Sequence, residues 1–159
     1  MSALSRWFVN FELARFLKFF QMFGSSMLPT FSDYDIVVED CLSVHLNPTK
    51  FSRGELITLC SPIEPSKSIC KRIIGLPGDV VCVDPLGQLA PSTEHVVVPK
   101  GHVWISGDNA SASRDSRHYG PVSMSLIRAR VVARVSRFLC TVAFLTLEDM
   151  AANVGYHPP

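Results

Sequence analysis

A serine and a lysine are the residues of this sequence whose types suit covalent chemistry. Ser26 lies in the serine motif, residues 24–30, which read GSSMLPT, and Lys71 begins the lysine motif, residues 71–79, which read KRIIGLPGD. Peptide hydrolysis needs an activated hydroxyl, and a lysine can activate one only when its amine is neutral. At its ordinary pKa only about 0.04% of a solvated lysine is neutral at pH 7, and burial raises that share by lowering the pKa.

Strand alternation predicts this burial for Lys71. If residues 68–74 form a strand, Lys71 projects from the same face as Ile69 and Ile73, opposite Arg72. A lysine on an apolar face destabilises a fold but is useful as a base.

A third segment, the GDN motif, combines Gly-Asp-Asn at 107–109 with Ser-Arg-Asp-Ser-Arg at 113–117 and Gly-Pro at 120–121. Taken singly, each motif has an ordinary structural explanation. Serines before a proline, Pro-Gly-Asp and Gly-Asp-Asn are all common in turns and loops. The order in which the three motifs occur is what makes them informative.

Together the motifs resemble the type I signal peptidase family of membrane-bound Ser/Lys endopeptidases. The family pattern S-M-x-P-T matches residues 26–30, K-R-x-x-G-x-P-G-D matches residues 71–79, and a weaker hydrophobic pattern matches residues 53–57. The resemblance covers about residues 24 to 135. Within the family, the short insertion between Asp84 and Gly101 is similar to the mitochondrial inner-membrane branch, and most to its first catalytic subunit. Lysine at position 71 argues against the endoplasmic-reticulum branch, which has histidine there.

The resemblance implies that Ser26 is the nucleophile and that Lys71 is the general base, which later protonates the leaving amine. It implies that the Ser113 hydroxyl helps to orient the lysine. Asp115 and Arg117 match a supporting ion pair, and a bidentate pair would hold the loop that carries Ser113. No metal or organic cofactor is expected.

The oxyanion of the tetrahedral intermediate needs preorganised donors. The backbone N–H of Ser26 is the expected first donor. Many bacterial relatives supply the second from a serine two positions before the nucleophile, where this chain has Gly24. A backbone amide near Gly24 and the Ser25 hydroxyl are the candidates for the second donor.

Two other patterns within the GDN motif invite different readings. His118 follows Asp115 closely, so the two could belong to a Ser/His/Asp triad. Nothing except the family match places either residue near Ser26. We therefore expect His118 to be a loop or surface histidine. Asn109-Ala110-Ser111 is formally a glycosylation sequon, which we expect to be structural because it lies inside the motif.

The resemblance also implies a substrate, partners and a location. The substrates would be precursor proteins with hydrophobic sorting signals, bound as an added strand by main-chain hydrogen bonds. The catalytic domain would face the intermembrane space from the inner membrane, beside a sister subunit, with no nucleic acid as partner. The alternative is a catalytically weak isoform or structural subunit, because the stretch before Ser26 is short and charged compared with the family's membrane span.

Short apolar runs separated by turn residues predict a mainly β fold of antiparallel, curled sheets or a partly open barrel. We expect strands at residues 34–39, 55–60, 68–74, 80–84, 95–99, 102–106 and 127–135. The last shows the clearest alternation, because alanine and branched residues share one face and Arg128, Arg130 and Arg134 share the other.

The expected organisation is an N-terminal anchor or membrane-proximal segment at 1–23, a peptidase domain at 24–140 and a tail at 141–159. Residues 7–23 are rich in Phe and Leu, and Glu12, Arg15 and Lys18 are spaced by three. This pattern predicts an amphipathic helix that lies in a membrane interface or docks on a partner, with packing on its own domain as the alternative.

The composition agrees with one globular domain. The 159 residues include 15 Lys plus Arg and 14 Asp plus Glu, a net charge of +1, which argues against wholesale nucleic-acid binding. Hydrophobic residues make up 47% and charged residues 18%, which excludes a disordered polyelectrolyte. The five scattered cysteines form no C-x-x-C pair and are expected to be structural.

Overall fold

The computed structural model describes residues 17–135, which fold around antiparallel β-structure. Within these residues the strands are β1 Leu17–Gln21, β2 Ile36–Asp40, β3 Leu56–Cys60, β4 Ser68–Gly75, β5 Val80–Cys82, β6 His95–Val97, β7 His102–Ser106, β8 Val122–Ser123 and β9 Ile127–Val135. Two short helices, α2 Cys41–Leu46 and α3 Ser116–Tyr119, and two 3₁₀ turns, Ala110–Ala112 and Met124–Leu126, complete the described elements.

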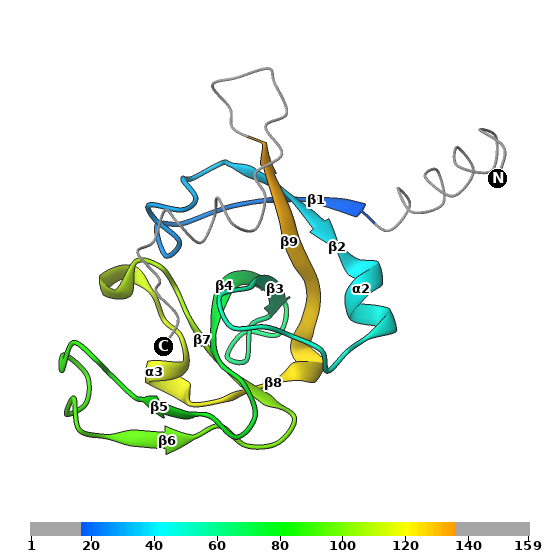
Figure 1. The fold of residues 1–159 in the computed structure, drawn as a ribbon. Coiled ribbons are helices and arrows are strands. Elements are labelled where there is room, and N and C mark those ends of the chain that lie inside the picture. Colours follow the sequence, from blue (N-terminus) through cyan, green and yellow to red (C-terminus); the bar gives the residue numbers. More distant parts are fainter. Residues whose placement is uncertain (1–16, 136–159) are drawn as a thin grey trace, which may run out of the picture.

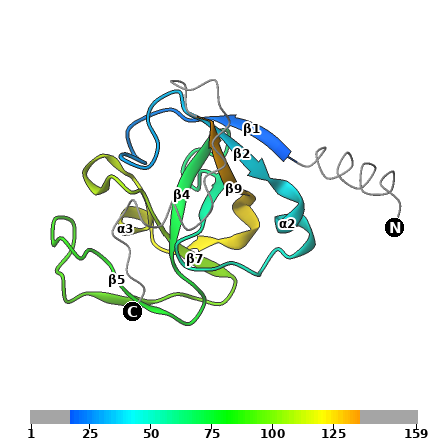
Figure 2. The same ribbon diagram turned by 45° about the horizontal axis from the view of Figure 1, so that its top comes forward.

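Seven of these strands form one sheet in the order β1-β2-β9-β3-β4-β7-β8, and β5 and β6 form a separate hairpin. Every pairing is antiparallel. The large sheet curls around its own core, as the two views in Figures 1 and 2 show. The predicted mainly β, curled architecture is therefore confirmed, and all seven predicted strands are present with bounds that differ by at most two residues.

The start of the described chain corrects one prediction. A helix was expected over residues 7–23, but Leu17–Gln21 is a strand, β1, paired with β2. Pairing satisfies backbone groups that β2 would otherwise leave open at the sheet edge, and Phe20 packs against the core from β1. The sheet thus begins before residue 24, and residues 7–16 of the expected helix lie outside the described residues. Among residues 17–135, no helix is long and apolar enough to cross a membrane.

The sheet buries side chains on both of its faces. On β3, the neighbours Leu56 and Ile57 enter different hydrophobic clusters, because successive side chains of a strand point to opposite faces. One cluster contains Ile57 and Ile73, and the other contains Met27 and Phe31 from the loop between β1 and β2. Burying both faces of β4 makes it a place where a polar side chain can be kept from water.

Two features of the sheet position the serine and lysine motifs. The loop between β1 and β2 is closed at its base, because Met22 N–H donates to the Asp35 carbonyl at 2.8 Å and Tyr34 N–H donates to the Met22 carbonyl at 2.9 Å. The ladder between β4 and β7 involves Arg72, Ile73 and Gly75 of β4. Residues 68–71 of β4 are therefore paired only with β3 in the described sheet, and their other edge is open.

Candidate active site

Ser26 and Lys71 meet although 45 residues separate them in the sequence. The Lys71 Nζ donates a hydrogen bond to Ser26 Oγ at 2.9 Å. Lys71 comes from β4, where its partner on β3 is the fully buried Ile57, and only 4% of the residue is exposed. Its neighbours two places away, Ile69 and Ile73, pack in the first hydrophobic cluster, as alternation predicts. The burial expected for this lysine is thus present, and its amine contacts the Ser26 hydroxyl.

Burial lowers the pKa of Lys71 below that of an ordinary lysine, because the charged amine loses hydration. The negative charges of Asp115 and Asp108 oppose this effect, and the Arg117 charge adds to it. Among the described residues, the amine makes its one hydrogen bond to Ser26 and forms no ion pair. The neutral form of the amine is therefore more populated here than on a surface lysine.

A small cavity of about 90 Å³ adjoins this pair of residues. It is lined by the end of β1 and the loop that follows it, by Ser26 and by residues 68–71 of β4. These lining residues include Phe20, Met22, Phe23, Ile69 and Lys71. Cys70 also lines it, but burial raises the pKa of that thiol to about 12, so it stays protonated near neutral pH. The hydroxyl, and not the thiol, is the group beside the neutral amine.

The serine motif is held in place by the GDN motif. Asn109 N–H donates to the Ser26 carbonyl at 3.0 Å, and Asn109 Nδ2 donates to the Ser25 carbonyl at 3.0 Å. The Asn109 Oδ1 accepts from Ser111, so the whole sequon is used structurally, as expected. Met27 and Phe31 anchor the same loop from the core side.

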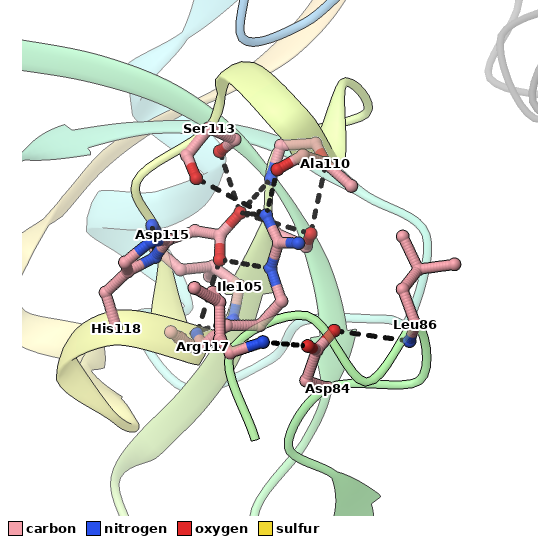
Figure 3. A network of polar contacts seen from close by, with 12 residues as sticks. Asp84, Leu86, Ile105, Ala110, Ser113, Asp115, Arg117 and His118 are labelled. Carbon is pink, nitrogen blue, oxygen red and sulfur yellow. Dashed lines mark hydrogen bonds and ion pairs between the residues drawn. The ribbon is translucent and has the colours of Figure 1, made fainter. Parts of the chain in front are cut away.

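The predicted ion pair between Asp115 and Arg117 is present and bidentate (Figure 3). Arg117 Nε donates to Asp115 Oδ1 at 2.9 Å and its Nη2 donates to Oδ2 at 3.0 Å. Burial opposes ionisation of Asp115, but hydrogen bonds from Arg117, Gly107 N–H and Ser113 together hold its pKa below the ordinary value. The carboxylate is therefore a fixed anchor for the GDN motif.

The Ser113 hydroxyl has a different partner from the expected one. It donates to Asp115 Oδ2 at 2.7 Å, and no hydrogen bond joins it to Lys71 within the described chain. His118 lies on the exposed side of α3, where its Nδ1 accepts from the Asp115 backbone N–H at 3.4 Å. A Ser/His/Asp triad is therefore not assembled here, because His118 caps a helix instead of contacting Ser26.

One of the three candidate oxyanion donors already has a hydrogen-bond partner, and the other two have none among residues 17–135. The Gly24 N–H donates to the Asp33 carboxylate, so this candidate is already engaged, a correction to the expected set. Within residues 17–135, neither the Ser26 N–H nor the Ser25 hydroxyl has a hydrogen-bond partner. These two groups remain available to an oxyanion beside Ser26 Oγ.

A buried ion pair ties the three motifs together. Arg72 Nε donates to Asp108 Oδ1 at 2.8 Å and Arg72 Nη2 donates to Oδ2 at 2.7 Å. Thr30, at the end of the serine motif, donates to the same carboxylate at 2.5 Å. Because Arg72 follows Lys71 and Asp108 precedes Asn109, this cluster fixes the relative positions of the serine and the lysine.

The last residues of the lysine motif shape the turn that follows β4. Gly75 leaves no room for a side chain, since a Cβ there would lie 2.7 Å from Val81 Cγ1. Gly78 has φ of +91°, which favours glycine. Asp79 accepts both from Arg53 and from the Leu76 N–H at 2.7 Å, which closes the turn.

Gly107 makes a close approach that should be sensitive to one added methyl group. A Cβ at this position would lie 2.3 Å from Ser113 Oγ and 2.5 Å from the Ser26 backbone oxygen. Gly107→Ala must therefore displace the serine motif or the GDN motif. We expect kcat to fall by at least about tenfold, because small displacements of reacting groups cost large factors in rate.

Gly75→Ala is the matched control for Gly107→Ala. Its added Cβ would meet only side-chain atoms, those of Val81, Trp104 and Val98. It should lower the melting temperature without lowering the activity per folded molecule. Equal specific activity for Gly107→Ala and wild type would show that the approach to Ser26 is not tight.

Comparison with known proteins agrees with this geometry. The model for "Signal peptidase, peptidase S26" matches residues 7–87 and 84–136, which include the whole site. The chain belongs to the signal peptidase S26 family. The resemblance inferred from the three motifs is thereby confirmed, and the family match extends further toward the N-terminus than residue 24.

Several relatives in this S26 family carry one name. "Mitochondrial inner membrane protease subunit 1" of Xenopus tropicalis is 48% identical over 112 residues, that of Schizosaccharomyces pombe 43% over 113 and that of Homo sapiens 42% over 112. Each alignment covers 70% of this chain, and 65%, 69% and 65% of the respective relatives, so the chain spans about two thirds of their lengths. A solved signal peptidase I from Enterococcus faecalis is 23% identical, with a TM-score of 0.41, over 52% of this chain and 97% of that one.

Some residues of this S26 site were not anticipated as site residues. The positioning roles of Asn109 and Gly107 and the cluster of Thr30, Arg72 and Asp108 emerge only from the structure. All five residues lie inside the three motifs. The motifs therefore marked these positions in the sequence without showing what each residue does.

Proposed function

We propose that this chain is a serine endopeptidase of the S26 family in which Ser26 and Lys71 form the catalytic pair. The observation that carries the proposal is the 2.9 Å contact between Lys71 Nζ and Ser26 Oγ, made by a lysine with 4% exposure. A lysine is rarely buried without a carboxylate partner unless its amine has a use in the neutral state.

The proposed reaction has two steps. The neutral Lys71 amine takes the Ser26 hydroxyl proton as Oγ attacks the peptide carbonyl, and the resulting ammonium gives that proton to the departing amine. Water then hydrolyses the Ser26 ester, with Lys71 again moving the proton. The Ser26 N–H and the Ser25 hydroxyl, both without partners in the described chain, would donate to the oxyanion.

Substrate recognition is proposed to use the open edge of β4. Residues 68–71 have a ladder partner on one side only, so an extended segment can add there as a strand. The adjoining cavity is small, about 90 Å³. We expect it to take a small side chain next to the cleaved bond in preference to a large one.

The location and partners are proposed from the relatives. Their names place them at the mitochondrial inner membrane as subunits of a protease, and a further relative, 35% identical over 111 residues, is called subunit 2 in Schizosaccharomyces pombe. We infer that this chain acts at the same membrane beside a sister subunit. Its site would face the intermembrane space and cut hydrophobic sorting segments from imported precursors.

The test is cleavage by the full chain reconstituted in lipid, alone and with a sister subunit. A precursor with a hydrophobic sorting segment should yield one new N-terminus, identified by sequencing. The residue before the cut should be small. Ser26→Ala should give no product under the same conditions. Product formation by Ser26→Ala, or no cleavage by wild type in either preparation, would overturn the proposal.

The pH dependence of cleavage follows from the neutral-amine requirement. Because burial lowers the pKa of Lys71, activity should rise with pH along a limb whose midpoint lies below about 10.4, the ordinary lysine value. Below that midpoint, kcat/KM should fall tenfold for each pH unit. A profile whose rising limb has the ordinary lysine midpoint would contradict the burial of the reacting amine.

A further inference from the structure

A second hollow is lined by Leu28 and Pro29 of the serine motif and by Asn109, which bonds the backbone of Ser26. Its volume is about 470 Å³, and it is lined by Leu28, Pro29, Leu86, Gln88, Asn109 and Ser111, among others. We propose that this leaving-side hollow receives the substrate residues that follow the scissile bond. The inference rests on the proposed endopeptidase function and adds a specificity-determining surface to it.

The hollow begins within a short reach of the nucleophile. Leu28 N–H donates to the Ser25 carbonyl at 3.2 Å, so Leu28 and Ser26 belong to one tight turn. Asn109, which lines the hollow, bonds the backbone of both Ser25 and Ser26. Since an extended chain advances about 3.3 Å per residue, the second and third residues after the cut would reach this hollow.

The two hollows are built from different segments of the chain. The small cavity comes from the β1 end and β4, whereas the leaving-side hollow comes from residues 28–29, 86–88 and 108–111. A bound substrate chain must extend in both directions from the attacked carbonyl. The acyl part stays on Ser26 after the first step and suits the small cavity beside Lys71, while the amine part must depart and suits the larger hollow.

The lining of the leaving-side hollow indicates what it would bind. Leu86 is 62% exposed, so an apolar side chain in the lining of this hollow is left open to water. Gln88 adds an amide group suited to a peptide backbone, whereas the Asn109 amide and the Ser111 hydroxyl already bond to each other, and the amide also bonds to the Ser25 carbonyl. The Asp108 carboxylate is occupied by Arg72 and Thr30. An uncharged, apolar side chain at the second or third residue after the cut is the expected preference.

The loop that carries Leu86 is anchored to the GDN motif. Asp84, fully buried at the start of this loop, accepts from the N–H groups of Leu86 at 3.2 Å and Leu89 at 2.6 Å. Figure 3 shows the Asp84 carboxylate beside the Arg117 side chain, and its charge favours the guanidinium ion there. The loop therefore has a fixed position relative to the site, as a recognition surface requires.

The test compares two exposed leucines of one loop. Leu86→Ala removes a side chain that lines the hollow, whereas Leu89→Ala removes one that does not and keeps its N–H bond to Asp84. Three substrates share the same residues before the cut. One has Leu at the second and third positions after it, one has Gly there, and one is an anilide with no residue after the cut.

Leu86→Ala should lower kcat/KM about five- to tenfold for the leucine peptide and leave the glycine peptide and the anilide within a factor of two. Leu89→Ala should match wild type on all three substrates. An equal effect of both variants, no effect of Leu86→Ala on the leucine peptide, or a loss that includes the anilide would overturn the inference. If wild type cleaves none of the substrates, the proposed function itself fails, which separates the two failures.

Discussion

Replacing Lys71 by methionine should reduce precursor cleavage by at least about a thousandfold without unfolding the protein. General base and acid catalysis is worth about 10²–10⁴ in rate, and here one amine would supply both steps. Methionine keeps a long, unbranched chain in a site that is 4% exposed, but it cannot take the proton from Ser26. The measurement is single-turnover cleavage of the precursor.

The same substitution should raise stability. A buried lysine with a lowered pKa binds fewer protons in the folded state than in the unfolded state, so stability increases with pH between the two pKa values. Below the folded pKa the native protein must bury an ammonium, and methionine removes that penalty. We expect the melting temperature of Lys71→Met to exceed that of wild type at pH 6, with the difference shrinking toward pH 10.

Lys67→Met is the matched control for Lys71→Met. Lys67 is an exposed lysine whose ammonium pairs with Glu64, so its loss should change neither cleavage nor stability appreciably. If Lys71→Met retained more than a tenth of wild-type cleavage, Lys71 would not be the base. A fall in its melting temperature at pH 6 would show that the ammonium is well accommodated.

Replacing Asp108 by alanine should destabilise the fold by about 3–5 kcal/mol, a large part of the stability of a small domain. Arg72 is 2% exposed, and its guanidinium shares two hydrogen bonds with the Asp108 carboxylate. Removing Asp108 leaves that buried charge without its carboxylate partner, and only the Gly54 carbonyl and the Thr30 hydroxyl, both uncharged, would still accept from it among the described residues. Urea denaturation of the two proteins measures the difference.

A double substitution tests whether the unpaired Arg72 charge causes the loss of stability. Arg72→Met combined with Asp108→Leu removes both charges and should recover much of the stability lost in Asp108→Ala. The exposed pair of Glu64 and Lys67 provides the control, since Glu64→Ala should change stability by less than about 0.5 kcal/mol. A loss below 1 kcal/mol for Asp108→Ala would mean that the Arg72 charge is not held by this carboxylate.

Local patterns were sufficient to predict most of the sheet. The alternation between Ile127 and Val135 gave β9 with its correct bounds, because every second residue from Ile127 to Ala133 is buried on one face. The alternation around Lys71 likewise predicted its burial. β1 was mistaken for a helix because Glu12, Arg15 and Lys18 repeat every three residues, whereas the strand at Leu17–Gln21 depends on pairing with β2.

The arrangement of the site depends on contacts that no local pattern encodes. Thr30 and Asp108 are 78 residues apart, and Asn109 reaches Ser25 across 84 residues. The Asp115 and Arg117 pair was predictable because the two residues are neighbours in one motif. The hydrogen bond of Ser113 to Asp115 instead of Lys71 depends on where the fold places the three side chains, which residue types alone do not determine.

The most direct test of the central claim is the titration of the Lys71 amine itself. Nuclear magnetic resonance of the protein labelled at the lysine side chains, with Lys71→Met identifying the signal, gives its pKa in the folded state. A neutral base beside Ser26 requires that this amine lose its proton well before the exposed lysines do. If the pKa of Lys71 instead equals the ordinary lysine value, the amine is solvated and charged at physiological pH, and the catalytic role assigned to it is wrong.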